Sequence, residues 1–151
     1  MIKKILYSFI LVSFLILPSY AEKIPVKISL TQIISTHHDE VEIGDKINFM
    51  AVKDIYVDEK LYIKKDTPIV GVIDYVHPNG WSSDYAQITF KTFYTKDVDN
   101  KKITISSPLT IKGNENLVNH LGDKLNVVLG WVFRGAEIFV EPDTKIYNIF
   151  M

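Results

Sequence analysis

The run His37-His38-Asp39-Glu40 carries the side chains best suited to metal chemistry, because imidazole and carboxylate groups bind zinc and nickel. Adjacent residues of an extended chain point to opposite sides, so only about two of the four can reach one ion without a special turn. The nearest further histidines, His77 and His120, lie in other loops. We therefore predict a solvated loop here, with no metal site and no cofactor.

A second group contains the residue types of a hydrolytic triad, namely His77, Ser82, Ser83 and Asp84. A triad serine needs a strained turn beside an oxyanion hole, and nothing around these serines resembles a nucleophile elbow. The sequence predicts an exposed turn and no catalytic residue. Likewise, Asp97 to Asn100 has the alternating acids of a calcium loop without the required Gly and Glu, so it predicts a hairpin turn.

Aromatic side chains gather in one segment of the chain, at Tyr75, Trp81, Tyr85, Phe90, Phe93 and Tyr94. Alternation places Phe90 in the core. Trp81 and Tyr85 follow the turn His77-Pro78-Asn79-Gly80, which projects side chains outward. We therefore name Trp81, Tyr85 and Asn79 as candidate contacts to an envelope protein or a glycan. Burial of the aromatic residues inside the domain is the alternative.

Charge and cysteine content exclude several classes of protein. Arg134 is the only arginine, and the formal net charge is −1, so we expect no nucleic-acid partner. The chain has no cysteine, which excludes thiol catalysis, disulfides and Cys-ligated zinc.

The N-terminus predicts export. Lys3 and Lys4 precede an apolar run from Ile5 to Leu17, which Pro18 ends, and small residues stand at Ser19 and Ala21. This pattern is typical of a signal peptide over residues 1–21, cleaved before Glu22. The run is shorter than the roughly 20 apolar residues that a membrane-spanning helix needs. We expect a protein that does not span the membrane after cleavage and that works in the bacterial periplasm or at the cell surface.

Residues 22–151 read as one all-β domain, a small barrel or sandwich. Apolar and polar residues alternate through short segments separated by turn residues, which is typical of half-buried strands. The segments are Ile24–Leu30, Lys46–Val52, Ile55–Val57, Leu61–Ile63, Ile69–Val76, Ala86–Tyr94, Lys102–Ile111, Leu125–Phe133, Glu137–Val140 and Lys145–Phe150. A single helical turn is expected over Asn114–Leu121.

Two stretches of sequence recur, which predicts two related β-units over about residues 43–73 and 121–150. Ile43 to Phe49 matches Leu121 to Val127, and Tyr62 to Ile69 matches Phe139 to Ile146. Units of this size bury a face only by packing together, here about a pseudo-two-fold axis. Four residues at matched positions should then be buried, namely Ile47, Leu125, Ile69 and Ile146. The segment 77–100 has no counterpart and is expected to be a hairpin free for function.

The turn from Ile63 to Gly71 is similar to one in the barrel domain of TrbI-like conjugation and type IV secretion proteins. Ile88 to Phe93 matches the next strand of that family and Lys101 to Ile105 the one after. Lys64 and Asp66 replace the Pro and Gly of the family's turn, and the family's linker and inner-membrane helix have no counterpart here. The resemblance implies a barrel related to a secretion channel and transfers no functional residue.

Taken together, these patterns predict an exported cell-envelope module that is not an enzyme and that serves a structural or binding role. Two alternatives stay open. One is a component related to a secretion or conjugation channel. The other is a hydrolase or metal-dependent enzyme whose site these patterns do not reveal.

Overall fold

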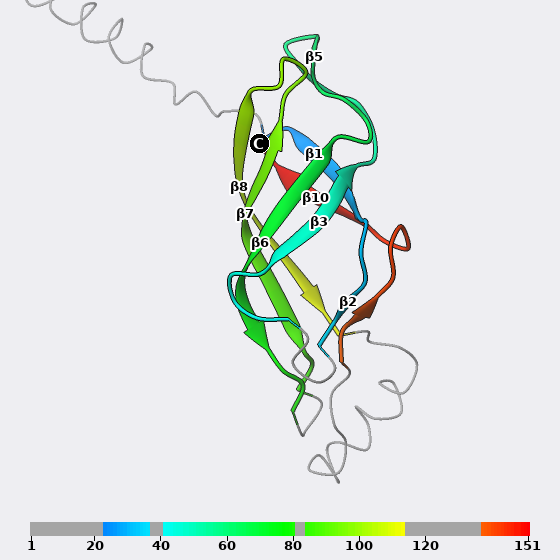
Figure 1. Cartoon of the computed structure of the whole chain (residues 1–151), viewed down its shortest axis with the longest axis vertical. Helices are drawn as coiled ribbons and strands as arrows, with labels where there is room; N and C mark the ends of the chain where they lie inside the picture. The colour runs from blue at the N-terminus through cyan, green and yellow to red at the C-terminus, as the bar shows by residue number, and fades with distance from the viewer. Residues whose placement is uncertain (1–22, 37–40, 81–83, 114–136) are drawn as a thin grey trace, which may run out of the picture.

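The computed structural model describes residues 23–36, 41–80, 84–113 and 137–151, and these residues form an all-β fold. Six antiparallel strands make a nearly closed, barrel-like sheet in the order β10-β1-β3-β6-β7-β8 (Figure 1). Two small two-stranded sheets, β2-β9 and β4-β5, flank it. The described part of the chain includes no helix that could cross a bilayer.

The strands follow the alternation of the sequence closely. Their bounds are β1 Pro25–Leu30, β2 Ile34–Ser35, β3 Lys46–Ala51, β4 Ile55–Val57, β5 Lys60–Ile63, β6 Pro68–His77, β7 Gln87–Lys96, β8 Lys102–Lys112, β9 Phe139–Val140 and β10 Ile146–Phe150. In β1, for example, Val26, Ile28 and Leu30 are buried as period two requires. The all-β prediction is confirmed, whereas β2 was not predicted. The expected helical turn at 114–121 and the expected strand at 125–133 lie outside the described residues.

Three aromatic rings form the centre of the core. Phe49 of β3 packs edge-on against Phe90 and Phe93 of β7, with ring centroids 5.5 and 5.8 Å apart. Gly71 of β6 lies against all three rings, because a Cβ built there would come within 2.8 to 3.1 Å of them. The missing side chain of Gly71 therefore makes room for the aromatic cluster.

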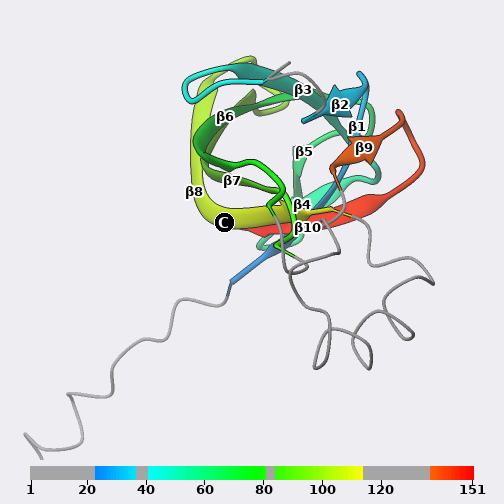
Figure 2. The same cartoon turned by 90° about the horizontal axis from the view of Figure 1, so that it is seen from below.

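The barrel closes between β8 and β10 through a side chain. The backbone N–H of Phe150 donates to the hydroxyl of Ser107, 3.0 Å away, and Ser107 is buried. The view along the barrel shows these two strands side by side at the seam (Figure 2). The hydroxyl of Ser107 thus accepts a hydrogen bond from a backbone N–H, a role that the carbonyl oxygens of a neighbouring strand have elsewhere in the sheet.

Two corners of the fold are built alike. The turn from β5 to β6 contains Asp66 and the turn from β9 to β10 contains Asp143, both with a positive φ. The Asp66 N–H donates to Ala51 at the end of β3, and the Asp143 N–H donates to Leu30 at the end of β1. β1 and β3 are neighbours in the sheet, with β10 outside β1 and β6 outside β3. The two corners therefore occupy corresponding places on either side of the β1–β3 pair.

The expected burial of Ile146 is wrong, because this side chain is 58% exposed whereas Ile69 is buried. β6 begins two residues after Asp66, but β10 begins three residues after Asp143. A shift of one residue turns every side chain of a strand to the other face. Ile47 is buried as predicted. The matched residues Lys124 and Leu125, and with them the first part of the predicted second unit, lie outside the described residues.

Tyr147 replaces Ile146 at the inward position, and its buried hydroxyl has no hydrogen-bond partner among the residues that the structure describes. Burial also raises the pKa of Tyr147 above its ordinary value of 10.0. We expect Tyr147→Phe to raise the free energy of unfolding by about 1 kcal/mol, because the variant no longer buries an unpaired hydroxyl. Urea denaturation at neutral pH measures this difference.

The raised pKa of Tyr147 determines how the stability of the fold changes with pH. Above pH 10 the phenol ionises more readily in the unfolded chain than in the folded one, so the wild type loses stability as the pH rises. The Tyr147→Phe variant has no phenol group, so it lacks this loss of stability at high pH. Tyr94→Phe is the control, because Tyr94 is 48% exposed and should change stability by less than about 0.5 kcal/mol. If Tyr147→Phe lowers the free energy of unfolding by about 1 kcal/mol, this account of the hydroxyl is contradicted.

Candidate functional site

The loop that was predicted to contact a partner is only partly described. Tyr85 and Asn79 are half-buried, and Trp81 lies outside the described residues. The Gly80 N–H donates to the carbonyl oxygen of Asp84, 2.8 Å away, which closes this loop locally. Nothing in this geometry assigns the three residues to a binding role, so their role as contacts stays a prediction.

His77 and Asp84, the two described members of the candidate triad, are in contact. His77 Nε2 lies 2.8 Å from Asp84 Oδ2, and both side chains are solvent-accessible. Ser82 and Ser83 lie outside the described residues. The neighbouring Tyr75 ring stacks on the His77 ring, with centroids 6.4 Å apart. The described atoms form an imidazole–carboxylate pair at the end of β6 and place no nucleophile beside it.

The metal-ligand candidates His37, His38, Asp39 and Glu40 lie outside the described residues. Within the described ranges, no group of three or more His, Asp or Glu side chains is arranged to hold a metal ion. The hairpin turn predicted at 97–100 is observed. Asp97 Oδ1 accepts the N–H groups of Asp99 and Lys101, at 2.9 and 2.8 Å, and Asn100 has a positive φ.

The segment 77–100 was expected to be a hairpin free of any role in the core, and this expectation is wrong. Its strand β7 pairs with both β6 and β8 in the middle of the main sheet. Ile88, Phe90 and Phe93 of β7 are fully buried. Most of the segment is therefore part of the barrel, and only its two ends are available for contact.

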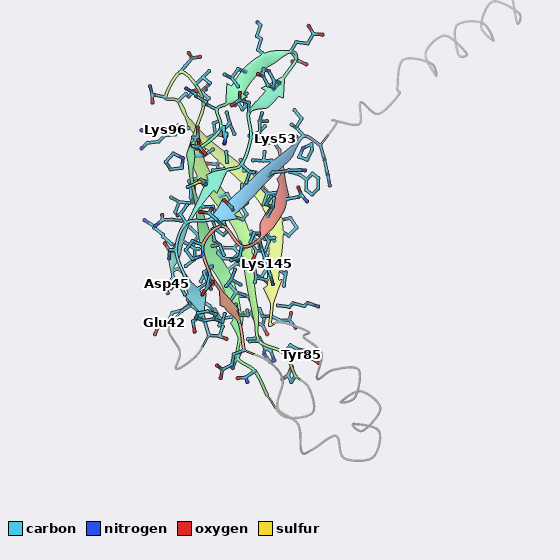
Figure 3. All side chains as sticks on the ribbon, turned by 90° about the vertical axis from the view of Figure 1, so that its right-hand side faces the viewer. Glu42, Asp45, Lys53, Tyr85, Lys96 and Lys145 are labelled. Carbon is cyan, nitrogen blue, oxygen red and sulfur yellow. The ribbon has the colours of Figure 1, made fainter. Side chains whose placement is uncertain are left out.

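A large hollow of the described surface lies at the far end of this segment, where β7 turns into β8. It has a volume of about 1030 Å³, and four lysines line it, namely Lys64, Lys65, Lys96 and Lys102. We call it the lysine groove. Its volume is at the upper end of the range of about 300–1,000 Å³ that is usual for ligand sites. Figure 3 labels Lys96 near this end of the barrel and Tyr85 near the opposite end.

The pairing of strands sets the lysines on one wall of the groove. Lys96 of β7 and Lys102 of β8 are register partners, and both side chains are exposed. Like charges directly opposite each other on neighbouring strands destabilise a sheet. Neither ammonium group has an ion-pair partner among the described residues. A bound anion would relieve the repulsion between them.

The other wall is the turn from β5 to β6, which contributes Lys64 and Lys65. The backbone N–H of Lys65 donates to Asp54 Oδ1, 2.7 Å away, so a contact with the β3–β4 connection holds this turn. The positive φ of Asp66 reverses the chain immediately before β6. The lysines on this wall thus project from a braced turn.

Apolar side chains share the lining of the groove with the lysines. Tyr94 and Val98 are 48% and 45% exposed, and Pro68, Val70 and Ile103 complete the apolar lining. The Thr95 hydroxyl donates to the Pro68 carbonyl at 2.8 Å, and the Val98 N–H donates to the Tyr62 carbonyl at 3.0 Å. These contacts fix the groove before any ligand arrives, which reduces the entropy lost on binding.

The negative charges of the groove do not neutralise its lysines. Asp66 and Asp97 are the carboxylates in its lining. Asp97 accepts two backbone N–H groups of its own turn, so its carboxylate is directed to the hairpin. The lining therefore carries four cations against two anions, although the whole chain has a net charge of −1. This arrangement suits the binding of an anionic group beside an apolar one.

Comparison with known proteins found no protein family, no curated protein and no solved structure that matches this chain.

Sequence reasoning missed the lysine groove because its residues come from separate segments. The doublets Lys64-Lys65 and Lys101-Lys102 were the available signal. Each doublet alone predicts only a solvated turn. Only the strand register brings the turn before β6 next to the β7–β8 hairpin.

Proposed function

We propose that this protein is an exported, non-enzymatic binding module of the bacterial cell envelope, and that it contacts its partner through the lysine groove. The observation that carries the proposal is the groove itself, in which exposed apolar side chains lie beside four lysines that have no ion-pair partner within the described part of the chain. Exposed apolar surface rimmed by polar residues marks interaction sites. A preformed hollow of this kind supports a binding role better than the half-buried Tyr85 and Asn79.

Export is proposed from the N-terminal sequence. Two lysines, an apolar run ended by Pro18, and small residues before Glu22 form the pattern of a cleaved signal peptide. The partner is then a component of the periplasm or of the cell surface. Residues 1–22 lie outside the described residues, so the proposal rests on the sequence.

We also propose that the barrel contains two related β-units. The matching corners at Asp66 and Asp143, and the symmetric order β10-β1-β3-β6, support this origin. In this arrangement β1 with β10 corresponds to β3 with β6, so the pair β3 and β6 is nested in the sequence between β1 and β10. The segment that begins at Lys124 lies outside the described residues, and its match to the segment at Lys46 stays a prediction.

A secretion-channel role is the second candidate. The turn from Ile63 to Gly71, which carries the resemblance to TrbI-like barrel domains, supplies one wall of the lysine groove. If this candidate holds, the groove contacts another channel component. It differs from the first candidate only in the identity of the partner.

Site-specific photo-crosslinking in living cells tests the binding role. Tyr94 lies in the groove and Tyr75 lies outside it, and the two side chains are almost equally exposed, at 48% and 47%. We expect a photoreactive phenylalanine at position 94 to give a discrete adduct with an envelope component, identified by mass spectrometry. The same group at position 75 should give at most about one tenth of that yield, because this position lies outside the groove in which we expect the partner to bind. Equal yields at both positions would contradict the proposal.

A further inference from the structure

We infer that the lysine groove binds an extended, acidic protein segment in which carboxylate side chains are interspersed with apolar ones. This inference rests on the proposed function and specifies the chemistry of the partner. It follows from three features of the groove, namely its charge, its apolar lining and the arrangement of its two walls.

The charge of the groove selects an anionic partner. Lys96 and Lys102 face each other across the β7–β8 pair, and the described residues give neither an ion-pair partner. A carboxylate placed over both would relieve their repulsion and gain two attractions at once. Complementary charge of this kind also accelerates association and suppresses partners of the wrong sign.

Two charged walls favour a chain over a small ion. Lys64 and Lys65 lie on the β5–β6 turn, whereas Lys96 and Lys102 lie on β7 and β8. The two groups therefore come from different elements of the fold, and apolar residues share the lining with them. One small anion satisfies one group, but a segment with several carboxylates satisfies both.

The lining favours a polypeptide over a polysaccharide. Pro68, Val70 and Val98 are aliphatic, and Tyr94 is the aromatic side chain among the groove's lining residues. Aliphatic surface suits Leu, Val or Ile side chains, whose burial removes apolar area from water. Sugar rings carry hydroxyl groups that such a surface leaves without hydrogen-bond partners. Nucleic acid is disfavoured because the lining contains no arginine.

Fluorescence anisotropy tests the inference with the processed chain purified from the envelope of expressing cells. The probe is a short labelled peptide that alternates Asp or Glu with Val or Leu. Two peptides serve as comparisons, one with each acid replaced by its amide and one with each apolar residue replaced by serine. Polygalacturonate serves as the anionic polysaccharide.

Charge reversal in the groove is the decisive variant. We expect Lys96→Glu combined with Lys102→Glu to weaken binding of the acidic peptide at least about tenfold, because the variant repels the carboxylates. The matched control is Lys27→Glu combined with Lys112→Glu, which changes the net charge equally at exposed positions outside the groove. The control should stay within about twofold of the wild type, since screening removes distant charges. Thermal unfolding verifies that both variants fold.

Each outcome has a defined meaning. The inference stands if the acidic peptide binds the wild type, both comparison peptides bind at least tenfold more weakly, and only the groove variant loses affinity. It is overturned if the wild type does not bind the acidic peptide, or if the control variant loses as much affinity as the groove variant. It is also overturned if the amide peptide, the serine peptide or polygalacturonate binds within about tenfold of the acidic peptide. A specific adduct at position 94 without binding of the acidic peptide would preserve the binding role and remove this partner class.

Discussion

Replacing Gly71 with valine is expected to lower the free energy of unfolding by about 3 kcal/mol or more. A Cβ at this position would lie 2.8 Å from Phe93, 3.0 Å from Phe49 and 3.1 Å from Phe90, and all three rings are buried. Side chains packed at this density cannot move aside without disturbing the rest of the core. Valine adds two further methyl groups to the same space, so overpacking at several contacts is unavoidable.

Urea denaturation of the wild type and the variant measures the effect. Gly44→Val is the comparison, because a Cβ at Gly44 meets nothing within 4 Å and only the positive φ of 96° opposes it. We expect this surface change to cost about 1 kcal/mol, the strain of an unfavourable backbone conformation. Gly71→Val combined with Phe93→Leu should recover part of the loss, since the smaller side chain makes room. A Gly71→Val protein as stable as the wild type would refute the close packing of the aromatic cluster.

The second large effect concerns export. Leu11→Arg places a charge in the middle of the apolar run from Ile5 to Leu17. A charged residue at the centre of an inserting segment costs about 2.5–3.5 kcal/mol. We therefore expect the variant to accumulate in the cytoplasm as an unprocessed chain, and the envelope fraction to lose most of the protein. Immunoblots of the two fractions measure the distribution.

Leu11→Ile controls for changes that preserve hydrophobicity, and it should be exported and processed normally. N-terminal sequencing of the exported wild type should begin at Glu22. An intact Met1 chain in the membrane pellet would show instead that the segment stays as an anchor.

Period-two alternation made most of the barrel predictable. It placed Val26, Ile28 and Leu30 on the buried face of β1 and put Phe90 in the core, as observed. The hairpin turn at 97–100 was also predictable, because an Asp side chain can accept N–H groups of its own turn. These features depend on neighbouring residues alone, so a single sequence contains the necessary information.

Features that depend on distant segments were not predictable. Ile146 was assigned to the wrong face of its strand. The connection from Asp143 to β10 is one residue longer than the connection from Asp66 to β6, and this extra residue reverses the alternation. β2 was missed because its two residues pair with β9, more than one hundred positions away. The lysine groove was missed for a similar reason, since the pairing of β6 with β7 brings the turn that carries Lys64 and Lys65 next to the β7–β8 hairpin.

The central claim is that the lysine groove holds a partner in the cell envelope, and crosslinking through position 94 in three backgrounds tests it most directly. The account predicts a discrete adduct with an envelope component in the otherwise wild-type protein. The adduct should fall at least about tenfold when Lys96→Glu and Lys102→Glu are added, and it should persist with Lys27→Glu and Lys112→Glu. An adduct of undiminished yield in the charge-reversed groove, or no adduct in any of the three backgrounds, would contradict the account.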